Sequence, residues 1–320
     1  MGSGLQNKEI TIGISSCLLG QAVRYDGRHQ FDPYINGTLK ELFDFVPVCP
    51  EVAIGLPVPR PPIHLVRRDD KVSVLGVEDK STDVTEALHA YGKRMGDELE
   101  IISGYIFKSS SPSCGMEQVR VYDEAGSPVG TAAGAFAYSL MKKLPLLPVE
   151  EEVRLGDTRL RENFIMRVFV YHRWKQMLAT GLCIESLQEF HADHQYLMMA
   201  HSPSTYERMG QMLTDINADE VKVVSCLYME ELMMALKRPA TRGQHVEVLQ
   251  QLLAHFSGRL GSDDKAEMVV VIKQYGEGVV PLIVPITLLK HHLRRHPDAS
   301  IERQVYLSPH PGELMLSNQA

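Results

Sequence analysis

The stretch ITIGISSCLLG (residues 10–20) joins an apolar run, typical of a buried β-strand, to a loop that carries a cysteine. Two later stretches repeat this combination. FDFVPV (43–48) is followed by Cys49, and ISGYIF (102–107) is followed by the loop SSSPSCG with Cys114. In open α/β sheets the carboxyl ends of parallel strands meet at one edge, and ligands bind there. If these strands are neighbours in one parallel sheet, the three thiols gather at that edge.

The residues around these stretches alternate between strand-like and helix-like patterns. Further strands are predicted at 72–77 and 119–123, and helices at 33–45, 82–100 and 130–144. Such alternation is typical of an α/β domain with a mainly parallel sheet covered by helices. Ser81 or Thr82 is expected to cap the second of these helices. The proline-rich stretch PVPRPPIH (57–64) predicts an extended loop that crosses the edge of the site.

A change of pattern at LPLLPVEEEVRLGD (144–157) indicates a domain boundary. We therefore expect an α/β domain over 1–150 and an all-α domain over 151–320. The second domain is expected to contain helices at 159–178, 202–213, 217–236, 243–258, 267–275 and 279–296. Cys183 and Cys226 fall within its helical patterns and are expected in its core.

The bulk composition is that of an ordinary globular protein. The chain has 320 residues, of which 44% are hydrophobic and 23% charged, and this length predicts two domains. It contains no apolar run of about 20 residues and no apolar signal segment at its start, and its five cysteines suggest no disulfide framework. We expect a reducing, cytoplasmic location. The net charge of −7 argues against indiscriminate nucleic-acid binding but leaves room for a local basic face.

Three converging thiolates admit three interpretations. They can hold an iron–sulfur cluster with one position open to a substrate. They can hold zinc with a bound water as nucleophile. Alternatively, each cysteine is a small buried apolar residue without a metal. Glu51 follows the second cysteine and a serine-rich loop precedes the third, so acid–base and hydroxyl groups would surround the same point.

Three motifs of the first domain resemble the thiouracil desulfidase family: TIGISSCLLGQAVRYDG (11–27), VPVCPEVAIGLPVPRPP (46–62) and FKSSSPSCG (107–115). Three motifs of the second domain resemble a helical domain that is often fused to it: FHADHQYLMMAHSPSTYERMG (190–210), LLKHHLRRH (288–296) and QVYLSPHPGELML (304–316). The fused form is similar to tRNA 4-thiouridine desulfidases. The resemblance thus covers nearly the whole chain.

The resemblance implies a [4Fe–4S] cluster held by Cys17, Cys49 and Cys114, with one iron left open for the thiocarbonyl sulfur. It also implies that Glu51 and Ser111 are catalytic. Water, oriented or deprotonated by Glu51, would attack C4 of the ring, and Ser111 would donate or relay a proton. The implied partner is tRNA that contains 4-thiouridine.

Other polar residues are candidates for binding. Arg24, Asp26, Lys108 and Ser109 are candidate substrate contacts, although Arg24 and Asp26 would also suit a local ion pair. Candidate RNA contacts in the second domain are Arg161, Arg167, His172, Arg173, Lys175, Arg294 and Arg295. Two other functions stay open. One is desulfidation of free thiopyrimidines with the helical domain as a scaffold, and the other is a metal-bearing RNA-binding protein without turnover.

Overall fold

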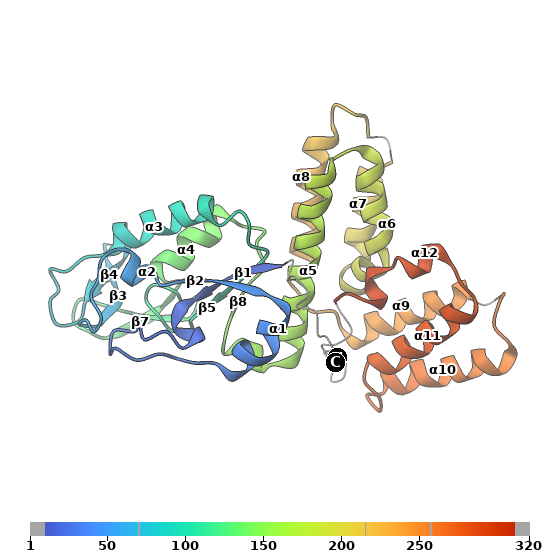
Figure 1. Cartoon of the computed structure of the whole chain (residues 1–320), viewed down its shortest axis with the longest axis horizontal. Coiled ribbons are helices and arrows are strands. Elements are labelled where there is room, and N and C mark those ends of the chain that lie inside the picture. The colour runs from blue at the N-terminus through green and yellow to red at the C-terminus, as the bar shows by residue number, and fades with distance from the viewer. Residues whose placement is uncertain (1–9, 70, 215, 257, 311–320) are drawn as a thin grey trace, which may run out of the picture. The chain divides into compact units, whose positions relative to one another are not determined.

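The computed structural model of this chain describes residues 10–69, 71–214, 216–256 and 258–310. The chain forms two compact units, Met1–Gly156 and Asp157–Ala320 (Figure 1). The first unit extends past residue 150, where the sequence suggested a boundary, because the strand β8 (Val149–Glu151) pairs with the sheet of this unit. Within the described ranges, no helix combines the length and the apolar character that a membrane crossing demands.

The first sheet consists of four parallel strands in the order β2-β1-β5-β8. Besides β8, they are β1 (Thr11–Ser15), β2 (Asp44–Val48) and β5 (Tyr105–Phe107). β1 lies between β2 and β5. The strands that precede the three cysteines are therefore neighbours, as predicted, and their carboxyl ends meet at one edge of the sheet.

The predicted strands at 72–77 and 119–123 belong to a second, mixed sheet instead. Its order is β4-β3-β6-β7, formed by β3 (Ile63–Arg68), β4 (Lys71–Gly76), β6 (Val119–Tyr122) and β7 (Pro128–Ala132). Two antiparallel hairpins, β3–β4 and β6–β7, join through a parallel pairing of β3 with β6. The prediction of a helix over 130–144 was thus wrong for its first residues. Residues 128–132 return as a strand after the turn between Asp123 and Ser127, and the helix begins only after Gly134.

Helices α3 (Thr85–Glu98) and α4 (Ala135–Lys143) pack against each other beside the first sheet (Figure 1). Phe136 of α4 is fully buried against the rings of Tyr105 and Phe107, so this helix covers β5. The predicted cap of α3 was wrong, because the hydroxyl groups of Ser81 and Thr82 donate to Asp79 in the preceding turn.

Short helical turns follow the strands of the site. A 3₁₀ turn spans Ser16–Leu19 after β1, and α2 (Pro50–Ala53) follows β2. The helix predicted at 33–45 is shorter than expected. It comprises a π-helical turn, Ile35–Leu39, and the single turn α1 (Lys40–Leu42), because β2 already begins at Asp44.

The described part of the second unit contains helices and no strand, which confirms the all-α prediction. The helices are α5 (Thr158–Thr180), α6 (Ile184–His201), α7 (Pro203–Met212), α8 (Val221–Leu236), α9 (Arg242–His255), α10 (Ser262–Gly276), α11 (Ile283–Arg295) and α12 (Ala299–Glu302), followed by the 3₁₀ turn Val305–Leu307.

Aromatic side chains from α5, α6 and α8 form a cluster in the second unit. The Trp174 ring of α5 stacks on Tyr228 of α8 and meets Phe190 of α6 edge-on. Helix α6 was not predicted. Cys183 begins it by accepting the N–H of Ser186, and both Cys183 and Cys226 are exposed rather than in the core, contrary to expectation.

Candidate functional site

A cavity of about 420 Å³ lies at the carboxyl edge of the first sheet. Its wall consists of the loops that follow β1, β2 and β5 together with the proline-rich loop before β3. The described residues that line it include Cys17, Cys49, Cys114, Glu51 and Ser111. The structure thus brings together the five residues for which the sequence predicted metal binding or catalysis.

Burial favours the protonated form of the three thiols when no metal is bound. Burial raises the pKa of Cys17 to about 11, and Arg24 and Lys108 oppose this effect. Burial likewise raises the pKa of Cys49 and, further, that of Cys114. The cysteines also affect one another. The negative charge of a neighbouring thiolate, Cys49, raises the pKa of Cys17, and those of Cys17 and Cys49 raise the pKa of Cys114. A bound metal would reverse this preference, because it favours the thiolate.

The donor set fits a cluster better than a single ion. Within the described ranges, no three His, Cys, Asp or Glu side chains are grouped so that one metal ion could be held. A cluster has a different requirement, because each thiolate binds its own iron and the sulfurs stand further apart than around one ion. Cys17 and Cys114, which are buried, and Cys49, which is partly exposed, line one cavity, and each can supply one thiolate to a cluster.

Glu51 is held from two sides. Arg60 donates from Nε to Glu51 Oε2 at 2.8 Å, and the Ser113 hydroxyl donates to Oε1 at 2.9 Å. The guanidinium of Arg60 also donates to the carbonyl oxygens of Pro57 and Val23, and the Arg60 side chain is only 3% exposed. The carboxylate is therefore fixed on the cavity wall in one orientation.

Sequence reasoning missed Arg60, although a signal was present. It is the only charged residue within 57–62, the proline-rich loop that was expected to cross the site. The loop does line the cavity, with Arg60 and Pro62 on its wall.

Ser111 organises the loop that carries Cys114. Its hydroxyl oxygen accepts the N–H of Cys114 at 3.1 Å and the N–H of Ser113 at 3.3 Å. Neither bond uses the hydroxyl hydrogen, so Ser111 can still donate a hydrogen bond into the cavity.

This loop also lies directly on the start of α4. The N–H of Ala135 donates to the Pro112 carbonyl oxygen at 3.1 Å. A Cβ at position 134 would lie 2.6 Å from the backbone of Ser113, so only glycine permits this approach. The third cysteine is thereby fixed relative to the sheet and the helix.

Lys108 and Ser109 also line the cavity, but they are engaged by an acidic residue of the predicted boundary. Glu152 accepts from Lys108 Nζ, from the Ser109 N–H at 2.7 Å and from the Ser109 hydroxyl at 2.8 Å. Glu151 accepts the Met116 N–H at 2.7 Å. Both carboxylates are buried, so Glu151 and Glu152 brace the loop after β5.

Arg24 lines the cavity, whereas Asp26 does not. The Arg24 Nε lies 3.6 Å from Asp26 Oδ1, and the same oxygen accepts the Arg28 N–H at 3.1 Å. Asp26 therefore pairs with Arg24 and tightens the loop, and the prediction that it contacts the substrate is not supported by its position.

The predicted RNA contacts on α5 do not form one exposed face. Arg167 is buried, and Arg161, His172, Arg173 and Lys175 are only partly exposed. The Arg173 guanidinium donates to the Pro309 carbonyl oxygen at 2.9 Å, and burial lowers its pKa to about 10. Arg294 and Arg295, in contrast, lie exposed in the last turn of α11.

Two parts of the chain match known family models. Residues 12–152 match the family model of 2-thiouracil desulfurase, and residues 195–311 match that of a protein family of unknown function, DUF1722. Residues 311–316 of the last sequence motif lie outside the described residues.

Two similar proteins span about half of this chain. The uncharacterized protein YbgA of Escherichia coli (strain K12) is 25% identical over 159 residues, which is 49% of this chain and 94% of its own. The solved structure of the [4Fe-4S]-dependent thiouracil desulfidase TudS has 30% sequence identity over 46% of this chain and 93% of its own, with a TM-score of 0.36. Through its first unit the chain therefore belongs to the 2-thiouracil desulfurase family, and its second unit carries the DUF1722 domain.

Proposed function

We propose that this protein is a [4Fe–4S]-dependent desulfidase that hydrolyses the C=S bond of 4-thiouridine in tRNA, giving uridine and hydrogen sulfide. One observation carries the proposal. Cys17, Cys49 and Cys114, from the ends of three neighbouring strands, line one cavity with Glu51 and Ser111. The similarity to a [4Fe-4S]-dependent thiouracil desulfidase supports the same chemistry.

The three cysteines would hold the cluster. When bound there, a cluster with three protein ligands supplies an open iron that attracts sulfur and polarises the C=S bond. The buried thiols meet this role as thiolates once the metal's positive charge is present. Ser15, whose hydroxyl hydrogen-bonds to Cys114 and accepts the Lys108 N–H at 2.9 Å, ties two of the loops together.

The remaining residues move protons. Glu51, oriented by Arg60 and Ser113, takes the proton of the water that adds to C4 of the ring. Ser111 donates its hydroxyl hydrogen to the ring as charge develops there. The C–S bond then breaks while the C4–O bond becomes a carbonyl, and sulfur leaves as hydrogen sulfide. Water supplies the oxygen and the protons, so no electron transfer is needed.

The tRNA partner is supported by the second unit. Arg294 and Arg295 are neighbouring exposed cations at the end of α11, where they can reach phosphates. A base within folded tRNA must leave its stack to enter a cavity. The protein must therefore also bind the sugar–phosphate backbone of the tRNA around that base. All five cysteines are free, which suits a reducing compartment such as the cytoplasm.

The cysteine assignment predicts a clear division among the five thiols. Full-length protein reconstituted anaerobically with iron and sulfide should show cluster absorption and convert 4-thiouridine in tRNA to uridine, measured by nucleoside analysis. Replacing Cys17, Cys49 or Cys114 by serine should abolish both. Cys183→Ser and Cys226→Ser, at exposed positions, are the matched controls and should change neither. Unchanged iron content and turnover in the first three variants would refute the assignment.

The choice of substrate distinguishes a second candidate function. The similarity to thiouracil desulfidase favours free thiopyrimidines as the alternative. Turnover of 2-thiouracil or free 4-thiouridine, with none of thiolated tRNA, would select that alternative. A stable cluster without turnover of any of these compounds would instead indicate a metal-bearing RNA-binding protein.

The RNA proposal predicts a salt effect at α11. The double variant Arg294→Gln/Arg295→Gln should bind tRNA more weakly, and the slope of log K against log salt should fall by about two. Filter binding at several salt concentrations measures this slope. Arg208→Gln is the control, because the Arg208 guanidinium is already paired with Glu231 at 2.8 Å. An unchanged slope in the double variant would exclude these arginines as phosphate contacts.

A further inference from the structure

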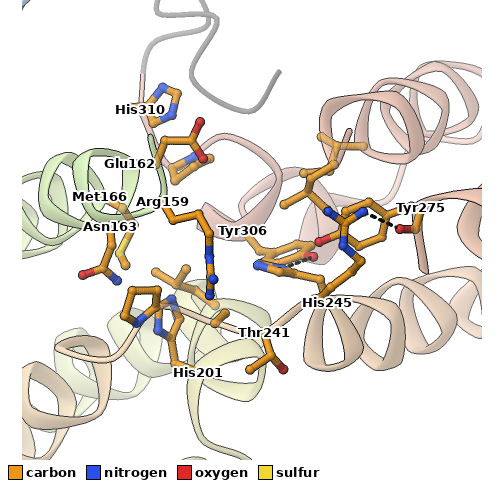
Figure 2. Close-up of a pocket in the computed structure, with 17 residues that line it drawn as sticks. Arg159, Glu162, Asn163, Met166, His201, Thr241, His245, Tyr275, Tyr306 and His310 are labelled. Atoms are coloured by element: carbon orange, nitrogen blue, oxygen red, sulfur yellow. Dashed lines mark hydrogen bonds between the residues drawn. The ribbon is translucent and has the colours of Figure 1, made fainter. Parts of the chain in front are cut away.

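The second unit contains its own cavity, of about 410 Å³, which the proposed desulfidase chemistry does not use (Figure 2). Its wall comes from α5, α6, α9, α10 and α11 and from the segment after α12. Cavities that bind small molecules commonly enclose about 300–1,000 Å³. This cavity is therefore large enough for a small organic ligand.

Two arginines give the cavity positive charge. Arg242 is occupied, because its Nη1 donates to the Tyr275 carbonyl oxygen at 2.9 Å and its guanidinium lies over the Tyr275 ring at 5.2 Å. Arg159 points into the cavity (Figure 2), and within the described part of the chain its guanidinium takes part in no ion pair or hydrogen bond. Arg159 thus offers its donors to a ligand.

Glu162 is the only acidic side chain among the described residues that line the cavity. Its Oε1 is buried without a hydrogen-bond partner in the described structure. Burial raises the pKa of Glu162 to about 7, and Arg161 opposes this effect. Near neutral pH a large share of this carboxyl group is protonated, so it cancels only part of the arginine charge and can donate a hydrogen bond.

Two histidines add neutral polar groups. Burial lowers the pKa of His201 to about 4 and that of His245 to about 3, so both rings are uncharged at neutral pH. His201 Nδ1 donates to the Arg238 carbonyl oxygen at 2.7 Å, and His245 Nδ1 lies 2.9 Å from the Tyr306 hydroxyl (Figure 2 shows the latter pair). These two histidines therefore add no charge to the cavity at neutral pH.

One part of the wall is apolar. Leu197, Leu282 and Ile286 contribute buried side chains, and Met166 and Pro239 extend the same surface. An inorganic anion would leave this part of the cavity without a partner. A ligand with both an anionic group and an apolar body would satisfy the whole wall.

We propose that this cavity binds a small organic anion, whose carboxylate or phosphate group meets Arg159 and whose apolar body lies against Leu197, Leu282 and Ile286. The site lies wholly within the second unit and does not depend on the cysteine cavity. It assigns to the helical domain a small-molecule site in addition to the proposed RNA contacts.

The test uses three probes on the full-length protein: benzoate, uridine 5′-monophosphate and inorganic phosphate, titrated by calorimetry. Benzoate or the nucleotide should bind saturably, and Arg159→Gln should weaken that binding by about 10- to 100-fold because a charge-assisted hydrogen bond is lost. The two organic probes separate a carboxylate from a phosphate-ester ligand. Arg208→Gln, at an exposed arginine of the same unit outside the cavity that is already paired with Glu231, should leave the affinity unchanged.

Three results would overturn the proposal. They are the absence of saturable binding for both organic probes, equal affinity of the unsubstituted protein and Arg159→Gln, and binding of inorganic phosphate as tight as that of the nucleotide. Arg159 is exposed at the mouth of the cavity, and circular dichroism of the variant would verify that it folds.

Glu162→Gln provides an independent measurement. At pH 8 this variant should bind benzoate several-fold more tightly than the unsubstituted protein, because a carboxylate facing the anion is removed, and at pH 6 the two should differ little. Benzoate is fully ionised at both values. The charged and titratable groups that line the cavity with Glu162 are Arg159, His201, Arg242, His245, Tyr275, Tyr306 and His310. Arg161, next to Glu162 on α5, lies outside the cavity lining and lowers the pKa of Glu162. All these groups are the same in both proteins, so equal affinities at pH 8 would contradict an anion bound beside Glu162.

Discussion

Replacing Glu51 by glutamine should slow sulfide release from the thiolated substrate by about 10²- to 10⁴-fold, the range that general acid–base groups contribute. Glutamine has the same shape, and its amide oxygen can still accept from Arg60 while its NH2 group donates to the Ser113 hydroxyl. It has no basic carboxylate, however, so the attacking water loses its proton acceptor. The iron content should stay unchanged, because Glu51 does not hold the cluster in this proposal. Single-turnover sulfide release under anaerobic conditions measures the loss.

The matched control for this prediction is Glu117→Gln. Glu117 is an exposed glutamate three residues after Cys114, and it does not line the cavity. Its replacement should leave the rate unchanged. Loss of iron from the Glu51 variant would show that Glu51 supports the cluster rather than the proton transfer, and an unaltered rate would remove it from the mechanism.

Replacing Arg60 by leucine should lower the free energy of unfolding of the first unit by about 3–5 kcal/mol, as expected when one partner of a buried ion pair is removed. The side chains of Arg60 and Glu51 are 3% and 13% exposed, so water cannot replace the lost partner well. The carbonyl oxygens of Pro57 and Val23 lose their donors in the same variant. Hydrogen exchange of peptides from the first unit, measured on cluster-free full-length protein, reports this change.

A double variant and a tryptophan provide the controls for Arg60. Glu51→Leu combined with Arg60→Leu should cost less than the two single changes together, because neither charge is then left buried alone. The only tryptophan, Trp174, lies in the second unit, and its fluorescence should show that this unit unfolds as before. Strict additivity of the two single variants would mean that the pair contributes no coupling.

The convergence of the cysteines was predictable because it follows from one rule of topology. Apolar runs before Cys17, Cys49 and Cys114 identify buried strands, and parallel neighbours place their ends together. The second sheet was not predictable in the same way. Its strands β4 and β6 were predicted, but β7 is exposed along nearly its whole length, and the alanine-rich residues 130–137 also suit a helix.

The charged side chains explain most of the remaining errors. Arg60 and Glu152 are buried because each forms an ion pair with a residue from another part of the sequence. Arg60 pairs with Glu51, and Glu152 pairs with Lys108. Such ion pairs leave no periodic pattern in the amino-acid sequence. Arg167 lies in a stretch of α5, residues 163–168, in which every residue is buried, so the basic residues of this helix do not form one solvent-facing stripe.

The bracing of the loop after β5 has a consequence for how the two units can be separated. Glu151 and Glu152 are the last acidic residues before the connection to α5, yet their carboxylates hold Met116, Ser109 and Lys108. A first unit cut at residue 150 would lose the braces of the loop that bears the third thiol. A gene fragment that encodes the cysteine cavity with its bracing must therefore continue at least to Glu152, close to Gly156, where the first compact unit ends.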